Sequence, residues 1–175
     1  MFFRKRVLSR TKLARGLISI EEVEYKYKDI LIEQGHEVHT LAFRLSFNQE
    51  RSFEMDLENP NINYDNDVLE ILTSFTKLIN TMSSPEELVY HEGREVGQSY
   101  GEKLFMNLFS MGKPRQCYAQ MTHDFHKSGE YHFDFEIQGF SDAFKGIFWE
   151  LIFDPYSERH FINKGARVLR NKEST

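Results

Sequence analysis

The stretch HTLAFRLSFNQERSFEMDL, residues 39–57, alternates apolar and polar side chains in two runs that the polar segment NQER separates. A period of two is typical of strands with one buried face, because successive side chains point to opposite sides of a sheet. The apolar positions are Leu41, Phe43, Leu45, Phe47, Phe53, Met55 and Leu57. We predict an antiparallel hairpin that turns at residues 48–51 and buries one face.

Beyond ENPNINYDN, which contains Pro60, the apolar spacing becomes helical. The stripe consists of Val68, Leu69, Ile71, Leu72, Phe75, Leu78, Ile79 and Met82. An aspartate just before such a stripe accepts hydrogen bonds from free backbone N–H groups, so Asp67 is the predicted N-cap. We expect a helix with a wide buried face.

Two more helices follow in the predicted order. The first begins at SSPEE, with Ser84 as N-cap, Pro85 at the first position and Glu87 completing a capping box. Its inward side chains are Leu88, Val96, Tyr100, Leu104 and Leu108, and its glycines Gly93, Gly97 and Gly101 form a smooth strip suited to tight packing. The second spans GKPRQCYAQMTHDFHKSG, begins near Pro114, ends at Gly129 and carries Cys117, Met121 and Phe125 on one stripe.

Further strands are expected on both sides of this helical part. Residues 23–33, VEYKYKDILIE, and 131–139, YHFDFEIQG, both alternate, and the apolar run of residues 146–155, GIFWELIFDP, suggests a buried strand. The last apolar strand lies within residues 160–170 and ends at Arg170. The order predicts an α+β or α/β two-layer sandwich, with N-terminal antiparallel strands, three helices and C-terminal strands.

The charge is distributed unevenly along the chain. The first fifteen residues carry six Lys or Arg and no acid, and the remaining 160 hold 16 bases and 27 acids, a net charge of −11. We therefore divide the chain into a basic tail, residues 1–16, and a single domain, residues 17–175. The acidic body argues against nucleic-acid binding by the domain itself. The basic tail is suited to nucleic acid, to anionic lipid or to an acidic partner. The tail is expected to be a solvated terminus, with a transit peptide as the alternative.

Few residues are candidates for chemistry. The single cysteine, Cys117, excludes an internal disulfide and suits a reducing, cytoplasmic setting. It falls on an apolar stripe, so we interpret it as core rather than as a nucleophile. His123, Asp124, His126 and His132 are spaced poorly for convergence on one metal ion, and we predict no metal site, no cofactor and no catalytic residue.

The segment FWELIFDP, followed by HFI and VLR, resembles the start signature of CHAT domains, the caspase-like peptidases associated with tetratricopeptide repeats. The matching positions are Trp149, Glu150, Leu151, Asp154, Pro155, Phe161 and Arg170, whereas Phe148 stands where the family usually has proline. The elements that precede this signature in the family are similar to three segments of this chain, namely EGREVGQSYGEKLFMNLF, YHFDFEIQG and the predicted hairpin. The resemblance covers residues 36–170.

The resemblance implies the front, non-catalytic half of a CHAT domain, because the family's catalytic His and Cys follow this signature. We expect a partner or regulatory subunit of a caspase-like peptidase in a bacterial defence or programmed-death system. Its partner would be a caspase-like or tetratricopeptide-repeat component, or a second copy. The alternatives are an N-terminal fragment of a complete CHAT peptidase and a free-standing domain that docks through its basic tail.

Glu150 adjoins Trp149 inside an apolar run, where a carboxylate needs a charged or multiply hydrogen-bonded partner. Arg170 is the predicted partner, since arginine can meet a carboxylate with two parallel hydrogen bonds. The resemblance also places an arginine at this position. The alternative is that Glu150 points to solvent while Trp149 alone is buried. If the pair is buried, its predicted role is structural rather than catalytic.

Overall fold

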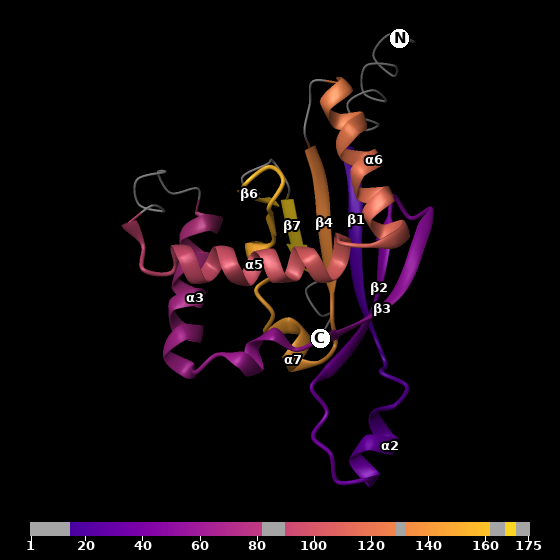
Figure 1. Ribbon diagram of the computed structural model, residues 1–175, viewed down its shortest axis with the longest axis vertical. Helices are drawn as coiled ribbons and strands as arrows, with labels where there is room; N and C mark the ends of the chain where they lie inside the picture. Colours follow the sequence, from indigo (N-terminus) through magenta and orange to yellow (C-terminus); the bar gives the residue numbers. More distant parts are fainter. Residues whose placement is uncertain (1–14, 82–89, 129–131, 162–166, 171–175) are drawn as a thin grey trace, which may run out of the picture.

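The computed structural model describes residues 15–81, 90–128, 132–161 and 167–170. Their main feature is a five-stranded mixed sheet in the order β3-β2-β1-β4-β7, with helices α5 and α6 in front of one face (Figure 1). The strands are β1 Arg15–Val23, β2 Thr40–Phe47, β3 Arg51–Glu58, β4 His132–Gln138, β5 Phe153–Asp154, β6 Arg159–His160 and β7 Arg167–Arg170. The helices are α2 Lys28–Glu33, α3 Asn66–Asn80, α5 Arg94–Phe109, α6 Gly112–Ser128 and α7 Asp142–Lys145, with 3-10 turns η1 Pro60–Asn63 and η2 Trp149–Leu151. The predicted α+β sandwich is confirmed.

The hairpin of β2 and β3 forms as predicted. The strands are antiparallel, and Leu45 lies opposite Phe53 in the ladder. Asn48 and Gln49 turn the chain with φ angles of 53° and 60°, a left-handed conformation that asparagine tolerates well. The Asn48 side chain accepts a hydrogen bond from the backbone N–H of Leu17 at 2.8 Å, which ties the turn to β1.

The first strand lies earlier than predicted. β1 ends at Val23, so the strand expected over residues 23–33 is wrong, and α2 occupies most of that segment. The ladder between β1 and β2 ends at the pair of Val23 and Ala42, and the chain beyond it has no neighbouring strand. Helical hydrogen bonds within Lys28–Glu33 satisfy the backbone instead, and Tyr27 stays exposed. Because β1 begins at Arg15, the last two residues of the predicted tail belong to the sheet.

The three predicted helices are recognisable, with corrected ends. Asp65 rather than Asp67 caps α3, since its Oδ1 accepts from the Val68 N–H at 2.9 Å while Asp67 lies within the first turn. The described helix α5 begins at Arg94, and the predicted Ser84 cap and Leu88 lie outside the described residues. In α6, Cys117 and Met121 are buried as expected.

The glycine strip of α5 serves close packing, as predicted. A Cβ atom at Gly101 would collide with the backbone carbonyl oxygen of Leu151. One turn earlier, a Cβ at Gly97 would lie 2.5 Å from the ring of Phe75 on α3. The absence of side chains at these two positions lets α5 lie directly against η2 and α3.

Residues 146–155 are mostly buried but do not form the expected strand. Only Phe153 and Asp154 are extended, and the chain before them folds through α7 and the 3-10 turn η2. Trp149, Leu151 and Ile152 are all fully buried. Periodicity cannot separate a buried strand from a buried turn in so short a run, so burial was predicted correctly and backbone geometry was not.

The core between the helices and the sheet is largely aromatic. The ring of Phe161 contacts rings from α5, α6 and β4, namely Phe105, Phe109, Tyr118, Phe133 and Phe135. Phe161 belongs to the C-terminal part of the signature, so this segment joins both helices to the sheet. Among the described residues, no helix has the length and apolar character needed to cross a membrane.

Candidate functional site

Trp149 anchors the signature in the core. Its indole N–H donates to the Phe144 carbonyl oxygen at 3.3 Å, so the one polar group of the side chain is satisfied. Its ring contacts Phe43 of β2 and Phe144 of α7 edge-on or tilted, with centroids 6.4 and 5.2 Å away. The side chain is 0% exposed, and it holds η2 against the sheet.

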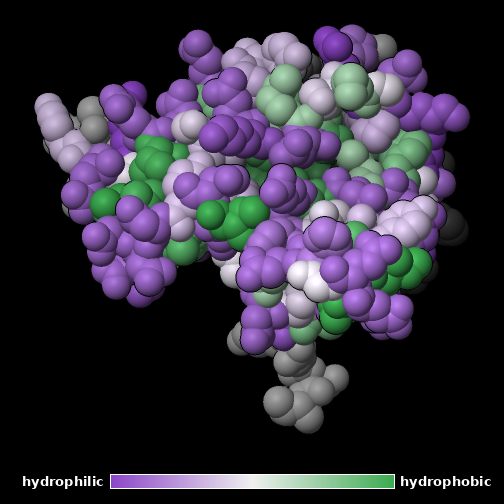
Figure 2. Space-filling view, turned by 60° about the horizontal axis from the view of Figure 1, so that its bottom comes forward, coloured by the Kyte–Doolittle hydropathy of each residue, from purple (hydrophilic) through white to green (hydrophobic). Residues whose placement is uncertain are grey.

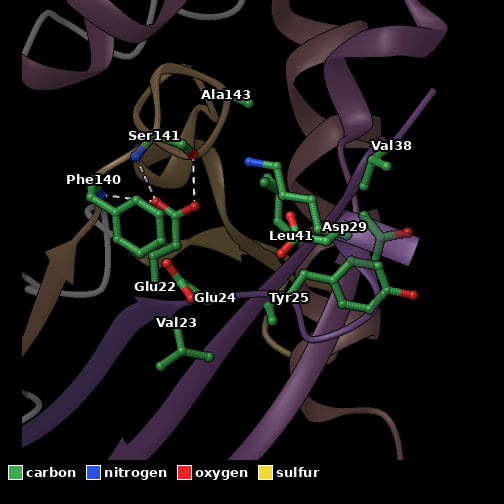
Figure 3. A pocket seen from close by; sticks show the side chains of 13 residues that line it. Glu22, Val23, Glu24, Tyr25, Asp29, Val38, Leu41, Phe140, Ser141 and Ala143 are labelled. Atoms are coloured by element: carbon green, nitrogen blue, oxygen red, sulfur yellow. Dashed lines mark hydrogen bonds between the residues drawn. The ribbon is translucent and has the colours of Figure 1, made fainter. Parts of the chain in front are cut away.

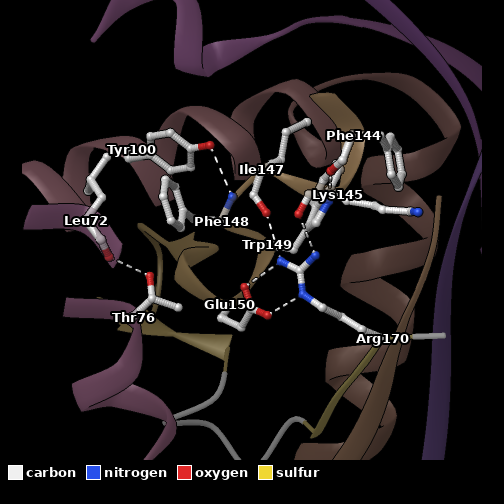
Figure 4. A network of polar contacts seen from close by, with 10 residues as sticks. All are labelled: Leu72, Thr76, Tyr100, Phe144, Lys145, Ile147, Phe148, Trp149, Glu150 and Arg170. Atoms are coloured by element: carbon white, nitrogen blue, oxygen red, sulfur yellow. Dashed lines mark hydrogen bonds and ion pairs between the residues drawn. The ribbon is translucent and has the colours of Figure 1, made fainter. Parts of the chain in front are cut away.

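Glu150 and Arg170 form the predicted ion pair (Figure 4). Arg170 Nε donates to Oε1 at 2.6 Å and Nη2 donates to Oε2 at 2.8 Å, a bidentate geometry. The Glu150 side chain is 10% exposed and that of Arg170 is 35% exposed. The alternative of a solvated Glu150 is therefore wrong. Glu150 lies on a 3-10 turn, so the pair joins a turn to a strand rather than two strands.

Two backbone carbonyl groups complete the environment of Arg170. Its Nη1 donates to the Lys145 carbonyl oxygen at 3.0 Å, and Nη2 also donates to that of Ile147 at 2.8 Å. These carbonyls lie at the end of α7 and just after it, where backbone acceptors are left free by the helix. Arg170, the last residue of β7, is thus held at four points by a single loop. We call this arrangement the Arg170 clamp.

A second polar network braces the same loop from α5. Tyr100 donates its hydroxyl hydrogen to Asn61 Oδ1 at 2.6 Å and accepts from the Phe148 N–H at 3.2 Å. Asn61 in turn donates to the Gly146 carbonyl oxygen at 2.8 Å. Burial raises the pKa of Tyr100 well above its ordinary value, so the phenol keeps its proton.

Asp154 and Pro155 shape the turn after η2. The Asp154 carboxylate is 3% exposed and accepts from the Tyr118 hydroxyl at 2.6 Å and from the Tyr156 N–H at 2.8 Å. Pro155 begins the turn that leads into β6. Asp154 therefore links this turn to α6, which is a structural role, and both signature residues lie beside the core.

β7 forms one edge of the sheet. It pairs in parallel with β4 on one side, with Val168 opposite Phe135. In the part of the chain that the structure describes, no strand pairs with its other side. Leu169 is 40% exposed there, and the Arg170 clamp fixes the end of the strand. Among the described residues, the arrangement presents a short strand edge that pairs with no other strand and whose last residue is fixed by the clamp.

The residues considered for catalysis or metal binding do not form a site among the described residues. Cys117 is buried in the aromatic core, and His123 is exposed on α6. The side chains of Asp124, His126 and His132 lie outside the described set. Within that set, no group of three or more His, Cys, Asp or Glu side chains is placed to hold a metal ion.

A hollow of about 280 Å³ lies where β1 and β4 end, and it was not anticipated from the sequence (Figure 3). Its floor includes the buried Glu22, which accepts from the N–H groups of Phe140 and Ser141 at 2.9 and 2.8 Å and from the Ser141 hydroxyl at 2.7 Å. These bonds hold the loop between β4 and α7. Glu22 is therefore satisfied within the fold, and its carboxylate is committed to this loop.

His160 is a further buried polar residue that the sequence analysis did not identify. One ring nitrogen donates to the Leu151 carbonyl oxygen at 2.8 Å, and the ring packs edge-on against Phe75 and Phe153. Burial lowers the pKa of His160 below its ordinary value. In the sequence, its burial was indicated only weakly, by its position next to the aromatic residue Phe161.

Comparison of the chain with protein-family models, with curated proteins and with solved structures found no match.

Proposed function

We propose that this chain is a non-catalytic, CHAT-like interaction domain that acts as a partner or regulatory subunit of a caspase-like peptidase in a bacterial defence or programmed-death system. The observation that carries the proposal is the open edge of β7, held in place by the Arg170 clamp. An added strand from another polypeptide would continue the sheet at this edge through main-chain hydrogen bonds. The buried position of Cys117 supports a role without peptidase chemistry.

The clamp matters because β7 has only four residues. So short a strand, paired on one side, gains little from its own ladder and would fray without further support. The bidentate pair and two carbonyl contacts instead tie its end to the loop that Trp149 and Tyr100 anchor. A pre-ordered edge lowers the entropy lost when a partner strand docks.

One face of the molecule favours binding at a strand edge over binding at a broad apolar patch. On the face shown in Figure 2, hydrophobic side chains lie in several separate patches among hydrophilic ones. Leu169 is an exposed apolar residue on β7 itself. Recognition through backbone groups, with one apolar side chain beside them, fits this surface.

The test compares two variants in native co-purification followed by mass spectrometry. Leu169→Lys puts a charge on the β7 edge, whereas Ser52→Lys puts one at an exposed position of β3, the opposite edge strand. We expect the wild type and Ser52→Lys to recover the same caspase-like or repeat-containing component, and Leu169→Lys to lose it. Recovery of the same component by all three proteins, or a monomer that recovers none, would overturn the proposal.

A further inference from the structure

Among the described residues, the face of the sheet opposite the helices is uncovered, which is unusual for parallel strands. β1, β4 and β7 run parallel to one another, and parallel strands are generally covered on both faces. In this structure α5 and α6 pack on one face, and within the described residues no element covers the other (Figure 1). We call the second side the outer face.

The ladder registers identify the residues of the outer face. Those whose charged side chains the structure describes are Glu21, Arg44, Glu54, Asp56, Glu58, Asp134, Glu136 and Arg167. Six of the eight are acids, so the face has a strong negative bias. Two acids on neighbouring strands bracket Arg44 at 3.6 and 3.7 Å, and Asp134 pairs with Arg167 at 2.9 Å.

These contacts use both arginines, and three carboxylates remain without a described cation. They are Asp56 and Glu58 on β3 and Glu136 on β4. They lie on both sides of the central strand β1, so the excess negative charge extends across the sheet. A basic partner would complement this surface.

The same chain carries such a segment. Residues 1–14 contain five Lys or Arg and no acid. They join the sheet at Arg15, the first residue of the central strand β1. Two residues later, Leu17 lies opposite Asp134 of β4, so the segment enters the sheet beside the outer face. A tether of this kind gives the segment a local concentration in the millimolar range, which a separate basic protein would have to exceed.

We propose that residues 1–14 dock on the outer face of their own sheet, through ion pairs between their basic side chains and the carboxylates of Asp56, Glu58 and Glu136. Fourteen residues in extended form reach about 45 Å, more than twice the roughly 19 Å across five strands. The segment therefore reaches either edge of the face. In the docked state it shields the charge of the outer face and leaves the β7 edge free.

The test measures how fast trypsin cleaves the native full-length chain after the basic residues of the segment, by mass spectrometry of the released peptides. The outer-face variant is Asp56→Asn, Glu58→Gln, Glu136→Gln, which leaves the Arg44 and Arg167 pairs intact. The matched control is Glu92→Gln, Glu95→Gln, Glu102→Gln, which removes the same charge from α5 and the loop before it. Circular dichroism establishes that both variants are folded.

We expect cleavage of the outer-face variant to be about tenfold faster than that of the control. Three exposed ion pairs together stabilise the docked state by an amount that corresponds to about this ratio of rates. Sodium chloride at high concentration should speed cleavage of the control toward the variant's rate. Equal rates in the two variants would overturn the proposal. Carbodiimide cross-links from Lys5 or Lys12 that join isotope-labelled to unlabelled chains in a mixture would also overturn it, since they would show docking on a second copy.

Discussion

Arg170 donates two parallel hydrogen bonds to the carboxylate of Glu150, at 2.6 and 2.8 Å, across 20 residues of sequence. The same guanidinium also donates to two backbone carbonyl groups, those of Lys145 and Ile147. One side chain thereby joins the end of an edge strand to the loop that contains Trp149. This relationship connects the signature in the sequence to the surface proposed for binding.

Loss of one partner of this pair should be costly. Glu150→Gln leaves a partly buried guanidinium without its counter-charge, and we expect the free energy of unfolding to fall by about 2–3 kcal/mol. The loss is below that of a fully buried pair because Arg170 keeps part of its hydration. Urea denaturation of Glu150→Gln, Arg170→Met and the double variant measures the coupling. Strictly additive effects would contradict a direct interaction.

Gly101 should not tolerate a side chain. Gly101→Ala brings a methyl group against the Leu151 carbonyl oxygen, a backbone atom that cannot turn aside. We expect a loss of about 3 kcal/mol or more, or displacement of α5 from η2. Gln98→Ala, at an exposed position of the same helix, is the control and should change the free energy of unfolding by less than about 0.5 kcal/mol. Thermal unfolding of the two variants distinguishes these outcomes.

The stability of the domain should fall in acid partly because of His160. Burial lowers the pKa of His160 in the folded state, so below about pH 6.5 the unfolded chain binds a proton that the folded chain does not. The free energy of unfolding therefore rises with pH through this window. His160→Asn retains a donor for the Leu151 carbonyl and removes the titration, so its pH dependence should be shallower.

The control for this experiment is His123→Asn, which makes the same substitution at an exposed position of α6. Urea denaturation between about pH 5 and 8 gives the slopes. An unchanged slope in His160→Asn would mean that His160 does not couple folding to protonation.

The purified chain is expected to show no peptidase activity. Cys117 is 8% exposed within the aromatic core, where a substrate carbonyl cannot reach its thiol. Turnover of a peptide panel by the wild type and by Cys117→Ala should equal the background of buffer alone. Cleavage that Cys117→Ala abolishes while its circular dichroism spectrum stays native would refute this expectation.

The spacing of apolar residues was sufficient to predict those helices and strands in which the same spacing recurs several times. The hairpin of β2 and β3, the helix α3 and the strand β4 each have several apolar positions at one period, so a single wrong position could not change the assignment. The spacing of Gly97 and Gly101 likewise predicted a packing face before any contact was known. The pairing of Glu150 with Arg170 was predictable because a carboxylate in an apolar run requires a partner.

Other features were decided only when the chain was folded. Residues 23–33 alternate like a strand, but all of them after Val23 lie beyond the last rung of the ladder between β1 and β2, and α2 forms at Lys28–Glu33. The run around Trp149 turns where α5 packs against it at Gly101, and the sequence of that run does not indicate this neighbour. Glu22 and His160 are buried by partners far away in the chain. Periodicity specifies which side chains need burial, whereas the tertiary structure decides which neighbours provide it and what backbone geometry they allow.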